Sequence, residues 1–256
     1  MDNQKLELIE KSGKNRIKRL GIVGGMGSET SCNFCLNVTN SINELTNCQP
    51  DILLENLPVS AKAESGIING EISLEIKSLL SDSIADLNNL NSDLIVIPCN
   101  TVHVFIDELR SESKAGILSI IEETAKECSK NGFKKIGLVA SETTVNQKLH
   151  ENELKKFGIE TVLPDSAEQK TINGIILKIL RDKGDINDKK ILLDLIKKLK
   201  SKDADAVMLG CTDLSSLISQ EESDLPLVDT LKILEKRCVE VLLTFINAGQ
   251  PLARSK

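Results

Sequence analysis

The sequence predicts an α/β fold, and two observations support this. Short runs of β-branched and aliphatic residues alternate with longer segments of helical period, a pattern typical of strand–helix units around a parallel sheet. In addition, segments of the first half of the chain recur in the second half in the same order. Together they predict two similar α/β lobes rather than one continuous sheet.

Seven short apolar runs have the length and composition of buried strands. The expected strands are 20–23, 52–55, 94–97, 136–139, 160–163, 206–209 and 225–228. The longer segments between them are polar on one face and apolar on the other, so we expect helices that cover the faces of the sheets.

Three pairs of segments carry the internal repeat. KRLGIVGG at Lys18 resembles KKIGLVAS at Lys134, LPVSAKAESGIING at Leu57 resembles LPDSAEQKTING at Leu163, and SDLIVIPCNT resembles DADAVMLGCTD with Cys99 aligned on Cys211. We therefore expect two pseudo-symmetric lobes, each a mostly parallel sheet flanked by helices, with the active site in the cleft between them. The expected division is a polar N-terminal tail 1–16, lobe 1 at 17–118 with 229–256 returning to it, and lobe 2 at 119–228.

The composition excludes several classes of protein. Aromatic residues make up 2% of the chain, with no Trp or Tyr, so stacking on nucleic-acid bases is not expected. A net charge of −6 argues against a basic surface for nucleic acid. No apolar run approaches the roughly 18 residues of a membrane span, and the polar start resembles neither a signal peptide nor an anchor. We expect a cytoplasmic protein that binds neither nucleic acid nor membrane.

The chain contains seven cysteines, and no secretory signal accompanies them. Reduced thiols are therefore expected. Cys32 and Cys35 form a single CxxC within a segment of helical period, where a packed or half-exposed pair is favoured over half of a metal site. Cys128 and Cys238 lie in amphipathic patterns and are interpreted as small buried hydrophobic residues.

Cys99 and Cys211 differ from the others because each follows an apolar strand directly. In parallel sheets, ligands bind beyond the carboxyl ends of the strands. A helix N-terminus at that position would favour the thiolate form of each cysteine. Two thiols facing one ligand from opposite sides suggest that one removes a proton from a carbon while the other returns one to the opposite face. The product would be the mirror image of the substrate.

The motifs LGIVGGMGSET, VIPCNTVHVF, EQK at 168–170 and LGCTD resemble those of the aspartate racemases in the cofactor-independent aspartate/glutamate racemase superfamily. The resemblance spans about residues 19–247. It implies two pseudo-symmetric lobes, one catalytic cysteine from each, no cofactor such as pyridoxal phosphate, and a homodimer. It also implies a small acidic amino acid as the substrate, most directly aspartate.

The resemblance also assigns roles to individual residues. Cys99 and Cys211 match the two catalytic thiols. Other positions match residues that contact the substrate: Met26 in the glycine-rich turn, Asn100 and Thr101 after the first cysteine, Ser141 and Thr144 in LVASETT, Lys170 for the distal carboxylate, and Thr212 after the second cysteine. Backbone N–H groups and hydroxyls at these positions suit a substrate carboxylate.

Three departures from the family pattern concern the substrate. Ser28 stands where the family has a proline, and Glu142 introduces a carboxylate into the threonine-rich turn. No arginine occurs within 57–64, where aspartate racemases supply one for the side-chain carboxylate. Lys62 is the nearest cation and is the candidate substitute for that arginine.

Several other interpretations remain open. The stretch from Gly21 to Gly27 does not match G-x-G-x-x-G, so a tight turn is favoured over dinucleotide binding. His103 could tune the Cys99 thiol or shield the cleft, but a simple surface or supporting histidine is favoured. Two histidines are too few for metal-dependent hydrolysis. Lys170 could be a solvated surface residue. The alternative functions are a glutamate or broad-specificity racemase, a maleate isomerase-like enzyme, or a non-catalytic small-ligand-binding protein.

Overall fold

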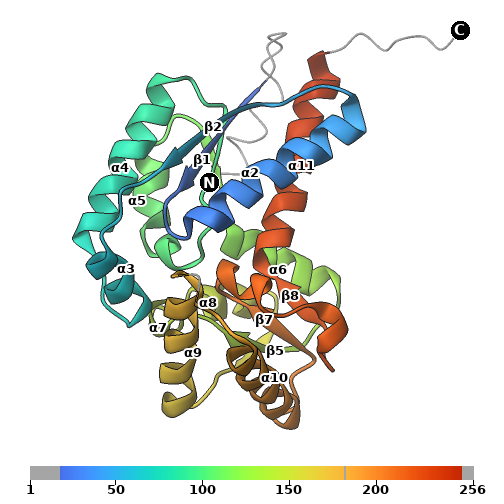
Figure 1. The fold of residues 1–256 in the computed structure, drawn as a ribbon. Helices are drawn as coiled ribbons and strands as arrows, with labels where there is room; N and C mark the ends of the chain where they lie inside the picture. The colour runs from blue at the N-terminus through green and yellow to red at the C-terminus, as the bar shows by residue number, and fades with distance from the viewer. Residues whose placement is uncertain (1–17, 182, 250–256) are drawn as a thin grey trace, which may run out of the picture.

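The computed structural model describes residues 18–181 and 183–249 as two four-stranded parallel sheets with helices packed around them (Figure 1). This confirms the α/β fold expected from the sequence. The expected polar tail 1–16, and the last residues of the expected returning segment, 250–256, lie outside the described residues.

The two sheets share one strand order. The first has the order β2-β1-β3-β4 and the second β6-β5-β7-β8, with every neighbouring pair parallel. The strands are β1 (Arg19–Gly24), β2 (Asp51–Asn56), β3 (Leu94–Val96), β4 (Gly116–Leu118), β5 (Lys135–Val139), β6 (Glu160–Val162), β7 (Ala206–Leu209) and β8 (Leu227–Asp229). The common topology is the structural counterpart of the repeat in the sequence.

Strand β4 is the one strand of the described sheets that the sequence analysis missed. Its three residues are too few to show a period, and β3 alone pairs with it. The strand expected at 225–228 begins later, at Leu227, because Pro226 has no N–H to donate; its carbonyl instead accepts from Val207 N at 2.9 Å. The strand expected at 94–97 ends at Val96, two residues before Pro98.

Two helices of the first half begin at serine residues that cap them. Ser60 accepts a hydrogen bond from Ala63 N, and Ser73 accepts one from Ile76 N, which satisfies N–H groups that a helix start leaves free. The helical segments are α2 (Ser28–Thr46), α3 (Ala61–Ile68), α4 (Leu74–Asn89), the short 3₁₀ helix η1 (Thr101–Phe105) and α5 (Ile106–Glu112).

In the second half of the chain, the two longest helices that precede the last helix begin with reciprocal caps. Asp165 with Glu168, and Asp185 with Asp188, form capping boxes at the starts of α9 and α10. The segments are α6 (Ile120–Lys130), α7 (Glu142–Asn146), α8 (Leu149–Lys155), α9 (Ser166–Ile179), α10 (Ile186–Ser201), and the 3₁₀ helices η2 (Thr212–Ser216) and η3 (Gln220–Glu222).

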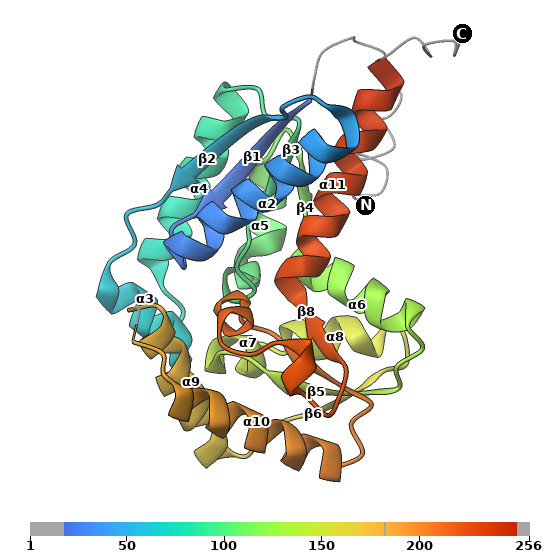
Figure 2. The same ribbon diagram turned by 45° about the vertical axis from the view of Figure 1, so that its right-hand side comes forward.

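The last helix, α11 (Thr230–Gly249), returns from the second sheet to the first half of the molecule. It packs along α2 and against α6 (Figures 1 and 2). Its buried residues Leu234 and Cys238 share one apolar core with Leu20 and Phe34. The lobe boundaries expected at residues 118 and 228 remain predictions. Within the described ranges, no helix has the length and apolar character needed to cross a membrane.

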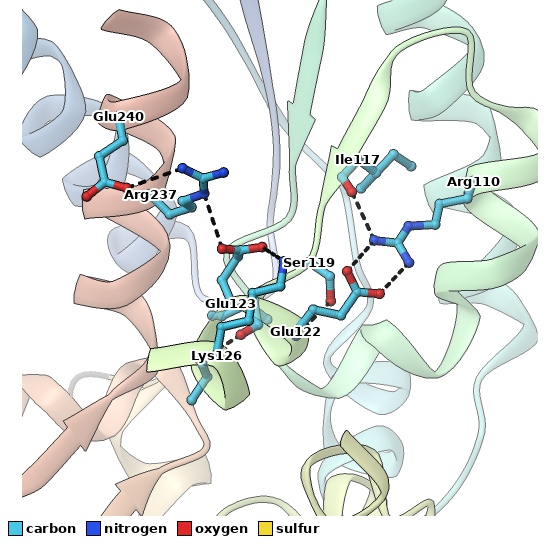
Figure 3. Close-up of polar contacts among 10 residues, drawn as sticks. Arg110, Ile117, Ser119, Glu122, Glu123, Lys126, Arg237 and Glu240 are labelled. Carbon is cyan, nitrogen blue, oxygen red and sulfur yellow. Dashed lines mark hydrogen bonds and ion pairs between the residues drawn. The ribbon is translucent and has the colours of Figure 1, made fainter. Parts of the chain in front are cut away.

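Ion pairs fix the start of α6, where the chain passes from the first sheet to the second (Figure 3). Arg110 of α5 donates to both carboxylate oxygens of Glu122, at 2.6 and 2.9 Å, and to the carbonyl of Ile117 at 3.2 Å. Arg237 of α11 lies 3.2 Å from the Glu123 carboxylate. A two-pronged, partly buried arginine–carboxylate pair is more stabilising than an exposed pair, so α6 is held to helices on both of its sides.

Candidate active site

Cys99 and Cys211 line one cavity between the two halves of the molecule. Cys99 follows β3 and Pro98, and Cys211 follows β7 and Gly210, so both lie at the carboxyl edge of their sheet. Cys99 is partly buried and Cys211 is buried. The cavity volume is about 30 Å³, whereas small-molecule sites usually offer roughly 300 Å³ or more. An amino acid would therefore enter only if the walls moved apart.

Neither thiol is in an environment that favours ionisation. Burial raises the pKa of the Cys99 thiol to about 11, since hydrogen bonds from the backbone N–H groups of Val102 and Thr101 offset only part of the effect. Burial, and then the Asp213 carboxylate, raise the pKa of the Cys211 thiol well above its usual range. The expectation that helix N-termini favour the thiolates is wrong for this structure, because only short 3₁₀ helices follow the cysteines and burial has the larger effect.

Asp213 is a functional candidate that the sequence analysis missed. The Cys211 Sγ–H donates to Asp213 Oδ2 at 3.6 Å, and Thr30 Oγ1 donates to Asp213 Oδ1 at 2.6 Å. Burial raises the pKa of Asp213, and the hydrogen bond from Thr30 lowers it in part. Asp213 therefore provides a carboxylate that could accept a proton from Cys211. The available signal was its position, two residues after Cys211, in the quoted motif LGCTD.

The glycine-rich turn brings its backbone directly against this carboxylate. Gly25 and Gly27 have φ angles of 95° and 90°, in the left-handed region that favours glycine. A Cβ on Gly27 would lie 2.6 Å from Asp213 Oδ1, and a Cβ on Gly25 would lie 2.4 Å from the carbonyl oxygen of Leu57. Met26, between them, lines the cavity. These contacts agree with the tight-turn interpretation of the sequence.

Replacing Gly27 by alanine is expected to disturb Asp213. The new methyl group would push the carboxylate away from Thr30 and Cys211, and the positive φ would cost about 1–2 kcal/mol. We expect the activity to fall by a larger factor than the loss of stability explains, measured as kcat/KM and as the free energy of unfolding. Gly158→Ala is the matched control, because Gly158 has φ 70° with no other atom within 4 Å of its Cβ position. Equal losses in both variants would contradict a role for the contact with Asp213.

Hydroxyl groups from the two halves meet behind the cavity. Thr101 Oγ1 lies 2.8 Å from Ser141 Oγ, which lies 2.9 Å from Thr144 Oγ1. All three residues are buried, but only Thr101 lines the cavity. Ser141 and Thr144 are thus one contact away from the cavity wall, and direct contact with a substrate remains a prediction for them.

Asn100 and Thr212 hold the two cysteine loops in place. The Asn100 Nδ2 donates to Thr230 Oγ1 at 3.0 Å, and His150 Nε2 lies 2.9 Å from Asn100 Oδ1. Thr212 Oγ1 donates to the carbonyl of Pro98 at 3.2 Å, which connects the second cysteine loop to the first. These side chains are already engaged, so their expected contacts with a substrate remain predictions.

His103 supports the Cys99 loop from inside the protein. Its side chain is buried, and its Nδ1 lies 2.8 Å from the Cys99 carbonyl oxygen, so Nδ1 carries the proton and donates. Burial lowers the pKa of His103 to about 4, which keeps the ring neutral near neutral pH. The buried position contradicts a surface histidine and agrees with a supporting one.

The two lysines proposed for a distal carboxylate lie outside the cavity wall. Lys62 on α3 and Lys170 on α9 are both exposed, and neither lines the cavity. The charged residues that do line it are Glu64 and Asp213. Glu142 accepts a hydrogen bond from Asn173 Nδ2 at 2.8 Å, so this carboxylate joins α7 to α9.

The two halves contain parallel sheets of the same topology, and each half contributes a cysteine at the end of a strand to one shared cavity. These features define a class of two-lobed α/β proteins with paired cysteines. The profile of the Asp/Glu/Hydantoin racemase family matches residues 23–238. The chain belongs to this family, and the resemblance inferred from its motifs is confirmed.

Individual relatives agree with this assignment. The chain is 26% identical over 231 residues to the broad specificity amino-acid racemase RacX of Bacillus subtilis, covering 88% of this chain and 99% of that protein. It resembles the structure of an aspartate racemase homologue from Pyrococcus horikoshii, with a TM-score of 0.71, 25% identity, and coverage of 88% and 99%. A second similar fold is the Picrophilus torridus aspartate racemase, with a TM-score of 0.73, 24% identity, and coverage of 93% and 96%.

Proposed function

We propose that the protein is an amino-acid racemase that uses Cys99 and Cys211 as an acid–base pair and requires no pyridoxal phosphate. The observation that carries the proposal is that one thiol from each half of the molecule lines the same cavity. Membership of the Asp/Glu/Hydantoin racemase family supports it. In this scheme one sulfur takes the α-proton of the substrate while the other gives a proton to the opposite face of the carbon.

A racemase of this kind needs one thiolate and one thiol at the same time. In the closed cavity burial disfavours both thiolates, but Cys211 has a proton acceptor beside it in Asp213. Transfer of the Cys211 proton to Asp213 gives a thiolate and a neutral carboxyl group without a change in net charge. The raised pKa of Asp213 makes this transfer easier than it would be to an ordinary carboxylate. We propose that Asp213 is the proton acceptor for Cys211.

The proposed substrates are free α-amino acids. Aspartate, which the motifs imply, would require a cation at its distal carboxylate, and Lys62 and Lys170 do not line the cavity. The relative named a broad specificity amino-acid racemase favours a wider range of side chains. Aspartate and glutamate therefore belong in the test as two candidate substrates among others.

A screen over the amino acids tests the proposal. Each L-amino acid, incubated with purified protein in D₂O without added cofactor, should be followed by chiral chromatography and by α-deuterium incorporation. We expect the D-enantiomer to form from at least one L-amino acid, with deuterium at its α-carbon. Conversion of maleate to fumarate without any α-exchange would favour the isomerase alternative. Ligand-dependent thermal stabilisation without turnover of any compound would favour a binding protein.

A further inference from the structure

The charge on the cavity wall differs from what an acidic substrate requires. The two charged residues that line the cavity, Glu64 and Asp213, are both acidic. Asp213 is already engaged by Thr30 and Cys211. Within residues 18–181 and 183–249, the Glu64 carboxylate forms no hydrogen bond or salt bridge. An unpaired carboxylate therefore faces the space where a substrate would bind.

Glu64 is held in this position by the helix that carries it. It lies in the first turn of α3, whose buried residues Ala63 and Ile67 pack into the core of the first half. Helix α3 also contacts α7 and α9 of the second half, so Glu64 is located at the junction between the halves. Burial raises the pKa of Glu64, Asp213 raises it further, and Arg181 lowers it.

The remaining wall of the cavity is mainly aliphatic. Branched apolar side chains from both halves form it: Ile67, Ile68, Ile76, Val102, Ile176 and Leu180. Such a wall suits a long methylene chain, and a carboxylate at the edge of the wall suits a positive charge at the end of that chain.

We propose that Glu64 is a specificity-determining residue that selects amino acids with a basic side chain, such as lysine or ornithine, over aspartate and glutamate. The inference rests on the proposed racemase function. An ammonium group would pair with the free carboxylate of Glu64. An acidic side chain would instead bring a third carboxylate to Glu64 and Asp213, and like charges repel strongly at a site with little water.

Arg181 is the cation whose positive charge would favour an acidic substrate. It is exposed, and it lines an adjoining cavity together with Asp213 rather than the cavity that holds both cysteines. Its charge acts on Glu64 and helps to keep that carboxylate ionised. Arg181 thus counteracts part of the rise in the Glu64 pKa that burial and Asp213 cause.

The test compares three substrates in the wild type and in Glu64→Gln. L-lysine, L-norleucine and L-glutamate differ mainly in the charge of the side chain. We expect the wild type to prefer lysine to glutamate by at least about 10-fold in kcat/KM. Glu64→Gln should lower the value for lysine by roughly 10–100-fold, the range for loss of a charge-assisted hydrogen bond. It should change kcat/KM for norleucine by less than about 3-fold, and it should raise kcat/KM for glutamate. Glu64→Lys should reverse the preference.

Glu160→Gln is the matched control, because it makes the same change at an exposed position on β6 outside the cavity wall. It should leave kcat/KM unchanged for all three substrates. A wild type that prefers glutamate would overturn the inference. Equal losses for lysine and norleucine in Glu64→Gln would also overturn it, since they would assign Glu64 to the α-ammonium group or to folding.

Ligand binding separates this inference from the proposed function. If no amino acid is racemised, the racemase proposal fails, and thermal stabilisation by the same three amino acids still reports on Glu64. Stabilisation of the wild type by lysine that is lost in Glu64→Gln supports the inference without any turnover. Equal stabilisation of both proteins by lysine, or none by lysine in the wild type, overturns it.

Discussion

Replacement of either Cys99 or Cys211 by alanine is expected to abolish racemisation of both enantiomers. Each turnover requires one sulfur to take the α-proton and the other to supply a proton from the opposite side. Loss of either group should therefore lower kcat/KM by at least about 100-fold in both directions. Circular dichroism at a fixed wavelength, started from each pure enantiomer, measures both directions. Cys32→Ala, at an exposed cysteine on α2, is the control and should retain full activity.

A one-base reaction separates the two cysteines from each other. β-Chloroalanine can lose its α-proton and then chloride, which gives 2-aminoacrylate. This product tautomerises to its imine, and water hydrolyses the imine to pyruvate and ammonia, so no proton is returned to the α-carbon. Cys99→Ala should retain this elimination from one enantiomer, and Cys211→Ala should retain it from the other. The double variant should lack both activities. If both single variants consume the same enantiomer, the two thiols do not act on opposite faces and the proposed mechanism is wrong.

The repeat in the sequence predicted the architecture because it is a property of the chain itself. SDLIVIPCNT and DADAVMLGCTD each contain a buried strand and its carboxyl end, so the pair located Cys99 and Cys211 without any knowledge of tertiary contacts. Both side chains line one cavity in the structure, and their catalytic roles remain a prediction. The sequence analysis missed the short strand β4, because three residues are too few to show a hydrophobic pattern.

Other features of the site depend on contacts between distant segments. The hydrogen bond from Thr30 to Asp213 joins residues 183 positions apart, and no local pattern reports such a contact. The motif resemblance implies Lys170, and Lys62 is the cation nearest to the position of the missing arginine, but both side chains are exposed. The expected direction of the shift in the thiol pKa values was also wrong. Helix ends can be inferred from a sequence, but the depth of burial cannot.

The pH dependence of elimination is expected to differ between the two single-cysteine variants. In Cys211→Ala the base is Cys99, whose pKa is about 11. The thiolate fraction grows tenfold with each pH unit below that value, so the rate should rise steadily from about pH 7 to about pH 10. In Cys99→Ala the base is Cys211, which can pass its proton to Asp213. Its rate should level off at a lower pH than the rate of Cys211→Ala does, because Cys211 passes its proton to ionised Asp213 and the raised pKa of that carboxyl group sets where the rise occurs.

Asp213→Asn should change the elimination rates of the two single-cysteine variants in opposite directions. In the Cys99→Ala background it removes the proton acceptor of Cys211, so the rate at neutral pH should fall by about 100-fold or more. In the Cys211→Ala background it removes a negative charge that raises the pKa of Cys99, so the rate at neutral pH should increase. The rate of alkylation of each remaining thiol as a function of pH gives an independent measure of the same shifts. Asp224→Asn, at an exposed aspartate, should alter neither profile. Losses of similar size in both backgrounds would show that Asp213 supports the fold rather than the proton transfer from Cys211.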